Sequence, residues 1–208
     1  MSIDTGGTTR TDPIPDVADP YALFADWFAE AKTKEINDPN AMYLATSTPD
    51  GFPSSRAVLM KDYDPRGFVF YTNYESRKGG ELLSNPRCAL LFHWKTMERQ
   101  VRVEGTAIPV MPEEADAYYA SRPYGSRIGA WASSQSRPLD GRDTLVKRVA
   151  EVEAEYPSET VPRPPHWSGF RVTPVRIEFW QAMPFRLHDR IVYSAVDGGG
   201  WTTGRLYP

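Results

Sequence analysis

A histidine lies between two arginines in the stretch FRLHDR, residues 185–190. The preceding stretch VRIEFWQ alternates apolar and polar side chains, which predicts a β-strand. If the chain stays extended beyond it, the side chains of Arg186, His188 and Arg190 point to the same side. Two arginines on one face repel each other inside a protein, and an anion bound between them reverses the sign of that interaction. This segment is therefore a candidate anion-binding or catalytic site.

Three more basic clusters occur earlier in the chain. Arginine binds phosphate through two parallel hydrogen bonds, lysine adds a point charge, and the start of a helix adds backbone N–H donors. Arg77 and Lys78 follow Ser76 at a predicted helix start and combine all three features. Each cluster alone is typical of a solvated surface, but four of them in a chain of net charge −3 favour local phosphate sites. The other two clusters are Arg56 with Lys61, which flank AVLM, and Arg122 with Arg127, which flank PYGS.

The motifs of several common enzyme classes are absent from the sequence. It contains no GxGxxG dinucleotide fingerprint, no GxxxxGK[ST] phosphate loop and no GxSxG nucleophile motif. His93, His166 and His188 lack the spacing of metal ligands, and Cys88 has no cysteine near it, so we predict no metal site. If the protein is an enzyme, we expect its reactive group to come from a bound cofactor.

Composition limits the partners that the chain can have. Lys and Arg number 24 against 27 Asp and Glu, which argues against a broad surface for nucleic acid or an anionic membrane. No apolar run is long enough to span a bilayer, and MSIDTGGTTR lacks the apolar core of a signal peptide. The single cysteine excludes an internal disulfide. We therefore expect a cytoplasmic protein.

The clusters must be positioned by a fold in which strands predominate. Residues 1–18 predict a flexible arm and residues 19–208 a single domain. Because most strands follow one another as hairpins, we predict a mainly β fold with peripheral helices, in which an antiparallel sheet closes into a barrel. Strands are predicted at 41–48, 52–63, 68–73, 87–94, 99–110, 170–180, 189–196 and 201–207, and helices at 19–36, 77–85, 112–122 and 139–156.

With these residues in view, the sequence resembles the pyridoxamine 5′-phosphate oxidase family. The motifs that carry the resemblance include RAVLMKDYD, GFVFYTN, SRKGGEL, ERQVRVEG, IEFWQ, RLHDR and the terminal RLYP. They extend from about Pro39 to Pro208 in the family's order and spacing. The arm departs from the family pattern, because it offers Arg10 but no Arg-x-x-Tyr of the kind that folds over the substrate in many members.

The resemblance implies a homodimeric split β-barrel with FMN at the subunit interface. The residues that it assigns to FMN are Arg56, Ala57, Val58, Leu59, Met60, Lys61, Tyr71, Thr72, Arg77, Lys78, Gln100, Gln135, Ser136, Trp180 and Arg190. Those that it assigns to the substrate are Lys61, Tyr118, Arg122, Ser126, Arg186, Leu187 and His188, with Arg186 and His188 as the catalytic residues. Strict strand alternation would put Arg56 and Lys61 on opposite faces, so either a bulge or a strand that ends before Lys61 is needed.

The implied reaction oxidises pyridoxine or pyridoxamine 5′-phosphate to pyridoxal 5′-phosphate. FMN takes the hydride and O2 reoxidises it, which gives hydrogen peroxide, with ammonia released from the amine. Arg186 would polarise or orient the substrate, and His188 between two cations would have a lowered pKa and be largely neutral at pH 7.

Two other functions stay open. One is a related flavin oxidase that acts on another substrate, such as a phenazine precursor. The other is a non-catalytic protein that binds flavin or pyridoxal phosphate. The residues that argue against the first are Tyr118, Arg122, Ser126, Arg186 and His188, because a ligand without phosphate would not need the cluster at 118–126. Intact Arg186 and His188 also disfavour the second.

Overall fold

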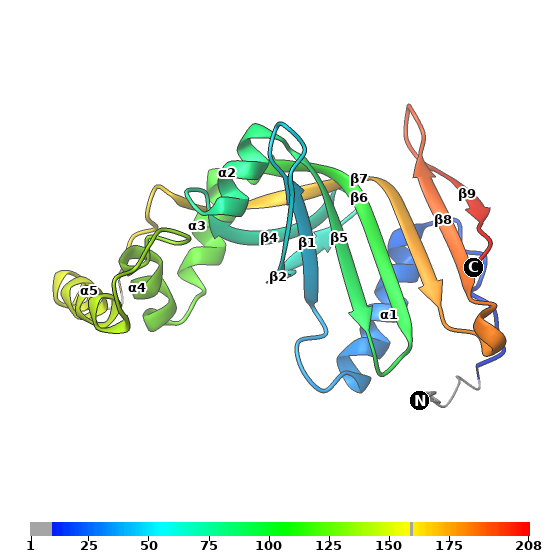
Figure 1. Ribbon diagram of the computed structural model, residues 1–208, viewed down its shortest axis with the longest axis horizontal. Coiled ribbons are helices and arrows are strands. Elements are labelled where there is room, and N and C mark those ends of the chain that lie inside the picture. The colour runs from blue at the N-terminus through cyan, green and yellow to red at the C-terminus, as the bar shows by residue number, and fades with distance from the viewer. Residues whose placement is uncertain (1–9, 159) are drawn as a thin grey trace.

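The computed structural model describes residues 10–158 and 160–208, which form nine strands and five α-helices around one curled antiparallel sheet (Figure 1). The strands are β1 (Ala41–Ser47), β2 (Pro53–Leu59), β3 (Asp62–Asp64), β4 (Gly67–Asn73), β5 (Arg87–Trp94), β6 (Arg99–Pro109), β7 (Trp167–Gln181), β8 (Asp189–Ala195) and β9 (Trp201–Arg205). The helices are α1 (Pro20–Lys34), α2 (Arg77–Ser84), α3 (Pro112–Ala120), α4 (Tyr124–Ala132) and α5 (Arg142–Glu155), with a 3-10 turn, η1, at Pro184–Arg186.

The sheet is organised around its longest strand, β7. One edge of β7 pairs with β6, and the strand order continues through β5 and β1 to β2. The other edge pairs first with β4, at residues 167–172, and then with β8, at residues 176–181. β3 extends the sheet beyond β4, and β9 extends it beyond β8. β7 therefore joins two parts of the sheet that lie at opposite ends of one strand (Figure 1).

Helix α1 covers one face of this sheet and supplies much of the core. Its apolar residues recur with the helical period, so they form one stripe that faces the strands. The Phe24 ring lies 5.1 Å from that of Phe92 on β5, and the Trp27 ring lies 5.2 Å from that of Phe179 on β7. All four side chains are buried, which ties the helix to both halves of the sheet.

Most of the predicted elements are confirmed, with small shifts at their ends. Asp19 accepts a hydrogen bond from the Tyr21 amide at 2.9 Å and caps α1, and Ser76 caps α2 in the same way. The strand predicted over 52–63 is wrong as a single element, because it is divided into β2 and β3. The sequence pattern does not predict α4, whose stretch YGSRIGAWA contains two glycines and has no side-chain cap.

Part of the arm predicted to be flexible is held against the domain. Residues 1–9 lie outside the described residues, but residues 10–18 follow an irregular path beside β8 and β9. Ile14 is 1% exposed, and its amide donates to Asp189 Oδ2 at 2.6 Å. Arg205 Nη2 donates to the Ile14 carbonyl at 2.8 Å. The division into an arm and a single domain stays a prediction.

Substitutions at two neighbouring glycines can test how closely α2 packs on the chain that precedes it. A Cβ atom at Gly79 would lie 2.4 Å from the Tyr74 carbonyl oxygen, whereas one at Gly80 would meet nothing within 4 Å. We expect Gly79→Ala to lower the free energy of unfolding by about 1–3 kcal/mol, because the backbone must move. Gly80→Ala should raise it by up to about 1 kcal/mol, since alanine favours a helix. Denaturant titrations measure both, and equal effects at the two positions would contradict this packing.

Candidate active site

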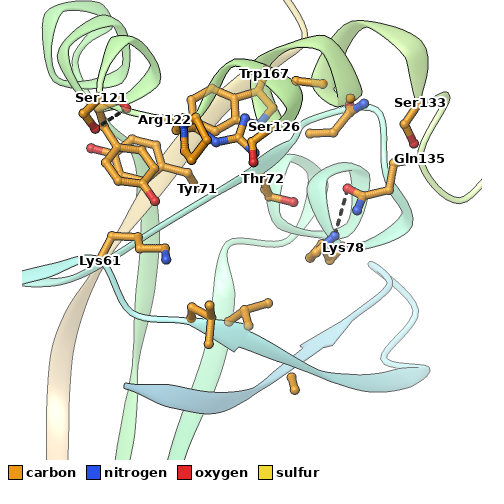
Figure 2. A pocket seen from close by; sticks show the side chains of 18 residues that line it. Lys61, Tyr71, Thr72, Lys78, Ser121, Arg122, Ser126, Ser133, Gln135 and Trp167 are labelled. Carbon is orange, nitrogen blue, oxygen red and sulfur yellow. Dashed lines mark hydrogen bonds between the residues drawn. The ribbon is translucent and has the colours of Figure 1, made fainter. Parts of the chain in front are cut away.

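A cavity of about 740 Å³ opens beside the first residue of β7 (Figure 2). Its walls come from the end of β2, from β4, from the start of α2 and from α3 and α4 with the turns that follow them. Members of three of the four basic clusters meet there. The predicted site residues that line the cavity are Ala57, Val58, Leu59, Lys61, Tyr71, Thr72, Lys78, Tyr118, Arg122, Ser126 and Gln135.

The cavity is positively charged. Lys61, Lys78 and Arg122 line it, and its described lining includes no aspartate or glutamate. The Arg122 guanidinium lies 4.7 Å over the Trp167 ring, and its buried Nη1 has no hydrogen-bond partner among the described residues. Burial lowers the pKa of Arg122, and a buried donor without an acceptor costs free energy. Because Arg122 lines the cavity, an anion bound there would pair with its charge.

One wall of the cavity consists of stacked aromatic rings. Tyr71 stacks on Tyr118 with 4.1 Å between the ring centroids, and Trp167 lies parallel to Tyr71 at 5.5 Å. Burial raises the pKa of Tyr71, which keeps this phenol neutral at pH 7. A flat, mostly apolar wall of this kind suits a planar ring. Trp167 carries no separate signal in the sequence, because only the fold places the start of β7 here.

Lys78 lies at another corner of the cavity, at the start of α2. Its Nζ donates to Ser76 Oγ and to Gln135 Oε1 at 3.2 Å each (Figure 2). Burial, and after it the charge of Arg56, lowers the pKa of Lys78. The first turn of α2 adds N–H donors and a partial positive charge. This corner therefore combines a lysine with a helix start, as the sequence predicts.

The structure decides how Arg56 and Lys61 are related. β2 ends at Leu59, and Lys61 lies past it, where its amide donates to the Val69 carbonyl at 2.8 Å. Lys61 lines the cavity, so its position beyond the strand end removes the need for a bulge. Arg56 is not among the lining residues, and its guanidinium instead forms an ion pair with Glu81 at 3.3 Å.

Glu81 on α2 is a buried carboxylate that the sequence analysis does not single out. It is 6% exposed and accepts hydrogen bonds from Thr46 and Ser54 and, at 2.9 Å, from Arg77. Burial alone would raise the pKa of this carboxyl group. The three hydrogen bonds and the charge of Arg56 outweigh burial and lower the pKa from 4.5 to about 2. Glu81 is therefore ionised at pH 7.

A second set of predicted residues lies at the far end of β7. Gln100 on β6 pairs with Trp180, which pairs in turn with Arg190 on β8, and the His188 ring lies 4.6 Å from the Trp180 ring. Trp180 lies thirteen steps along the strand from Trp167 at the cavity, which is up to about 43 Å at 3.3 Å per residue. A single chain therefore does not bring the two sets together.

The stretch FRLHDR is not extended, so the prediction that its basic residues share one strand face is wrong. β7 ends before it, and η1 contains Phe185 and Arg186 at positive φ angles of 58° and 63°. The His188 Nδ1 accepts a hydrogen bond from the Met183 amide at 3.2 Å. Burial, and after it the charge of Arg186, lowers the pKa of His188, which confirms the predicted direction.

Four further residues predicted to contact ligands lie outside the described cavity lining. Met60 is 3% exposed within the core, and Leu187 is 67% exposed beside η1. Arg77 is bound to Glu81, and Ser136 is an exposed residue with a positive φ of 70°. Their assigned roles stay predictions.

The low pKa of Glu81 predicts how stability depends on pH. A carboxyl group whose pKa is lower in the folded chain stabilises the fold above its unfolded pKa near 4.5, and this contribution is lost as the pH falls toward 2. We expect the difference in unfolding free energy between the wild type and Glu81→Gln to shrink over that range, because the variant has no group to protonate there. A difference that stays constant from about pH 6 to about pH 2.5 would contradict this assignment.

Two family models match the chain. One, described as pyridoxamine 5′-phosphate oxidase, matches residues 28–156. The other, described as pyridoxine 5′-phosphate oxidase C-terminal dimerisation region, matches residues 167–208. The first match contains most of the cavity lining, and the second contains β7, β8 and β9.

Relatives match over nearly the whole chain. A pyridoxine/pyridoxamine 5′-phosphate oxidase of Rhodospirillum rubrum is 64% identical over 91% of this chain and 96% of its own. The oxidase of the same name from Caulobacter vibrioides is 60% identical over 94% of this chain and 88% of its own. That of Brucella canis is 57% identical over 97% of this chain and 100% of its own.

Two solved structures share the fold. PhzG from Burkholderia lata 383, in complex with tetrahydrophenazine-1-carboxylic acid, has a TM-score of 0.90 at 34% identity and covers 98% of this chain and 100% of its own. A pyridoxamine 5′-phosphate oxidase-related, FMN-binding protein from Nostoc punctiforme has a TM-score of 0.74 at 14% identity over 93% of this chain and 100% of its own, which shows the fold alone. The predicted split β-barrel is thus confirmed. On the family models and these relatives, the chain belongs to the pyridoxamine 5′-phosphate oxidase family.

Proposed function

We propose that the chain is an FMN-dependent oxidase that converts pyridoxine 5′-phosphate or pyridoxamine 5′-phosphate to pyridoxal 5′-phosphate. O2 is the electron acceptor, hydrogen peroxide is released, and the amine substrate also yields ammonia. The observation that carries the proposal is a cavity with three cations, no carboxylate in its described lining and a wall of stacked rings. Cofactor and substrate are both monophosphate esters of flat rings, so they need what this cavity offers. Relatives at 57–64% identity are named for the same activity.

The start of α2 fits the phosphate of FMN. Lys78 lines the cavity there, and Arg56 and Arg77 flank the same helix start through their shared partner Glu81. Thr72 and Gln135 border this corner and would contact the cofactor from the same chain. Bound FMN would supply the hydride acceptor, and these residues would fix its position.

The other end of the cavity fits the phosphate of the substrate. Arg122 lines the cavity here, and Lys61 provides a second cation (Figure 2). The hydroxyl groups of Tyr118 and Ser126 complete the set of donors. Together they would hold the phosphoryl group while the tyrosine stack bounds the ring.

Completion of the site requires a second copy of the chain. Arg186, His188 and Arg190 lie at the end of β7 that is remote from the cavity, in the region matched by the dimerisation model. In a two-fold homodimer, the far end of β7 in one copy would meet the cavity of the other. There Arg186 and the neutral His188 would orient the substrate ring against the flavin, and Arg190 would contact the cofactor.

A second candidate function is the oxidation of a phenazine precursor. PhzG favours it, because its structure with tetrahydrophenazine-1-carboxylic acid has a TM-score of 0.90 to this chain. The hydrogen-bond donors of Lys61, Arg122 and Ser126 favour the phosphorylated vitamer instead. The phosphate dianion of the vitamer can accept more hydrogen bonds from these side chains than the single carboxylate of the phenazine precursor can.

We also infer that the protein acts in the cytoplasm without nucleic-acid or membrane partners. The net charge of −3 provides no broad basic surface. The chain has one cysteine, Cys88, and therefore no internal disulfide, which fits a reducing compartment. Burial raises the pKa of this thiol to about 12, so it is unreactive at pH 7. Within residues 10–158 and 160–208, the structure has no helix with the length and apolarity to cross a bilayer.

The purified protein should be yellow and should release hydrogen peroxide when it is given pyridoxine 5′-phosphate in air. Arg186→Leu should lower turnover by about 10- to 100-fold while FMN stays bound, because Arg186 would act on the substrate and not on the phosphate of FMN. Flavin absorbance and a coupled peroxide assay measure both effects. Arg148→Met on α5, an exposed arginine paired with Glu151, is the control and should match the wild type.

Yellow protein that releases no peroxide with either vitamer would contradict the proposed activity. Peroxide release with tetrahydrophenazine-1-carboxylic acid, but with neither vitamer, would favour the second candidate. Full activity of Arg186→Leu would remove the role given to this arginine.

A further inference from the structure

Glu81 occupies an unusual place for an acidic residue. It lies in α2 beside a predicted phosphate site, its side chain is 6% exposed, and it does not line the cavity. Around it are three cations, Arg56, Arg77 and Lys78. Burial is the main cause that lowers the pKa of Arg56, and the charge of Arg77 lowers it further. Burial is also the main cause for Lys78, and the charge of Arg56 adds to it. The three cations therefore lie close together.

The two oxygens of Glu81 hold different arginines. Oε1 accepts from Arg77 Nε at 2.9 Å. Oε2 pairs with Arg56 Nη2 at 3.3 Å and accepts hydrogen bonds from Thr46 and, at 2.7 Å, from Ser54. The hydroxyl groups anchor the carboxylate to β1 and β2, and they also accept hydrogen bonds from Arg56, whose Nη1 donates to Thr46 Oγ1 at 2.6 Å. The carboxylate joins this group to Arg77 and so helps to set the spacing of the two guanidinium groups.

Charge alone gives no reason for a carboxylate in this position. Three cations and one carboxylate leave a net charge of +2, whereas the cations alone would give +3 and would attract a phosphate more strongly. A buried carboxylate so near the phosphate therefore opposes binding through its charge. Its contribution to binding must come from the geometry that it imposes on the arginines.

We propose that Glu81 is a positioning residue that fixes Arg56 and Arg77 for the phosphate of FMN and thereby sets cofactor affinity. The inference rests on the proposed function, since it takes FMN to be the ligand at this corner. A positioning role and a purely electrostatic role predict opposite changes in FMN affinity when Glu81 loses its charge. Removal of the negative charge should weaken FMN binding, although the site becomes more positive.

The experiment titrates apoprotein with FMN and follows the quenching of flavin fluorescence. Glu81→Gln should raise the Kd for FMN by about tenfold, because the amide cannot accept hydrogen bonds from both arginines and both hydroxyl groups. At saturating FMN its turnover should fall by a smaller factor than its affinity for FMN, since Glu81 does not line the cavity. Glu75→Gln is the matched control: Glu75 is exposed next to the same helix start and forms no ion pair with the described residues. Its Kd should stay within about twofold of the wild type.

A double-mutant cycle separates positioning from a general effect on the fold. In an Arg77→Met background, Glu81→Gln should weaken FMN binding by only about threefold, because one of its two targets is gone. An undiminished tenfold loss in that background would show that Glu81 does not act through Arg77, and would overturn the inference. If Glu81→Gln does not fold, Glu81→Asp serves instead. It keeps the charge but withdraws the carboxylate, so it should also weaken FMN binding.

The outcomes distinguish this inference from the proposed function. Wild-type protein that takes up no FMN overturns the proposed function, and the role of Glu81 with it. Wild-type protein that binds FMN tightly while Glu81→Gln binds it equally well or better overturns the role of Glu81 alone.

Discussion

The length of β7 is the constraint on which the rest of the structure depends. A fifteen-residue strand is rigid, and it holds the cavity at Trp167 and the cluster around Trp180 at opposite ends of one sheet. No rotation of side chains closes a separation of that size. On the proposed function, each chain would carry two halves of a site that it cannot join, and a two-fold dimer would join them twice. The strand that pairs with β4, β6 and β8 would thus also leave the proposed site incomplete in a monomer.

Charge pairing explains why the cavity stays free to bind anions. At α3, whose Tyr118 lines the cavity, Glu114 pairs with Arg171 and Asp116 pairs with Arg163, and Arg171 also pairs with Asp64. These ion pairs help to fix the helix. Lys61 and Arg122 instead face a cavity whose described lining has no carboxylate. In α2 the carboxylate of Glu81 is present, but it is buried, is paired with Arg56 and Arg77, and does not line the cavity. Acidic residues in this fold thus anchor the basic ones outside the cavity and are kept out of its interior.

The sequence predicted the parts of the fold that depend on local patterns. Alternation located the strands, and Asp19 and Ser76 marked helix starts, because capping needs only neighbouring residues. The family resemblance brought together most of the cavity lining. Contacts between distant parts of the chain could not be predicted. In the sequence, Glu81 resembles a surface residue of a short helix, and it is buried only because β1 and β2 pack against it. The turn at Arg186 escaped prediction because non-glycine residues seldom adopt positive φ, so alternation was the natural expectation.

The most direct measurement of the shared site is the activity of a mixed dimer. Arg122→Met damages the cavity, and Arg186→Leu damages the far end of β7, so either variant alone should lose at least about nine tenths of its turnover. Co-expression with two different affinity tags, followed by purification on both, isolates dimers that contain one copy of each. If the halves come from different copies, one of the two sites is intact, and turnover should return to about half that of the wild-type dimer. Mixed dimers as inactive as the two parent variants would contradict the account.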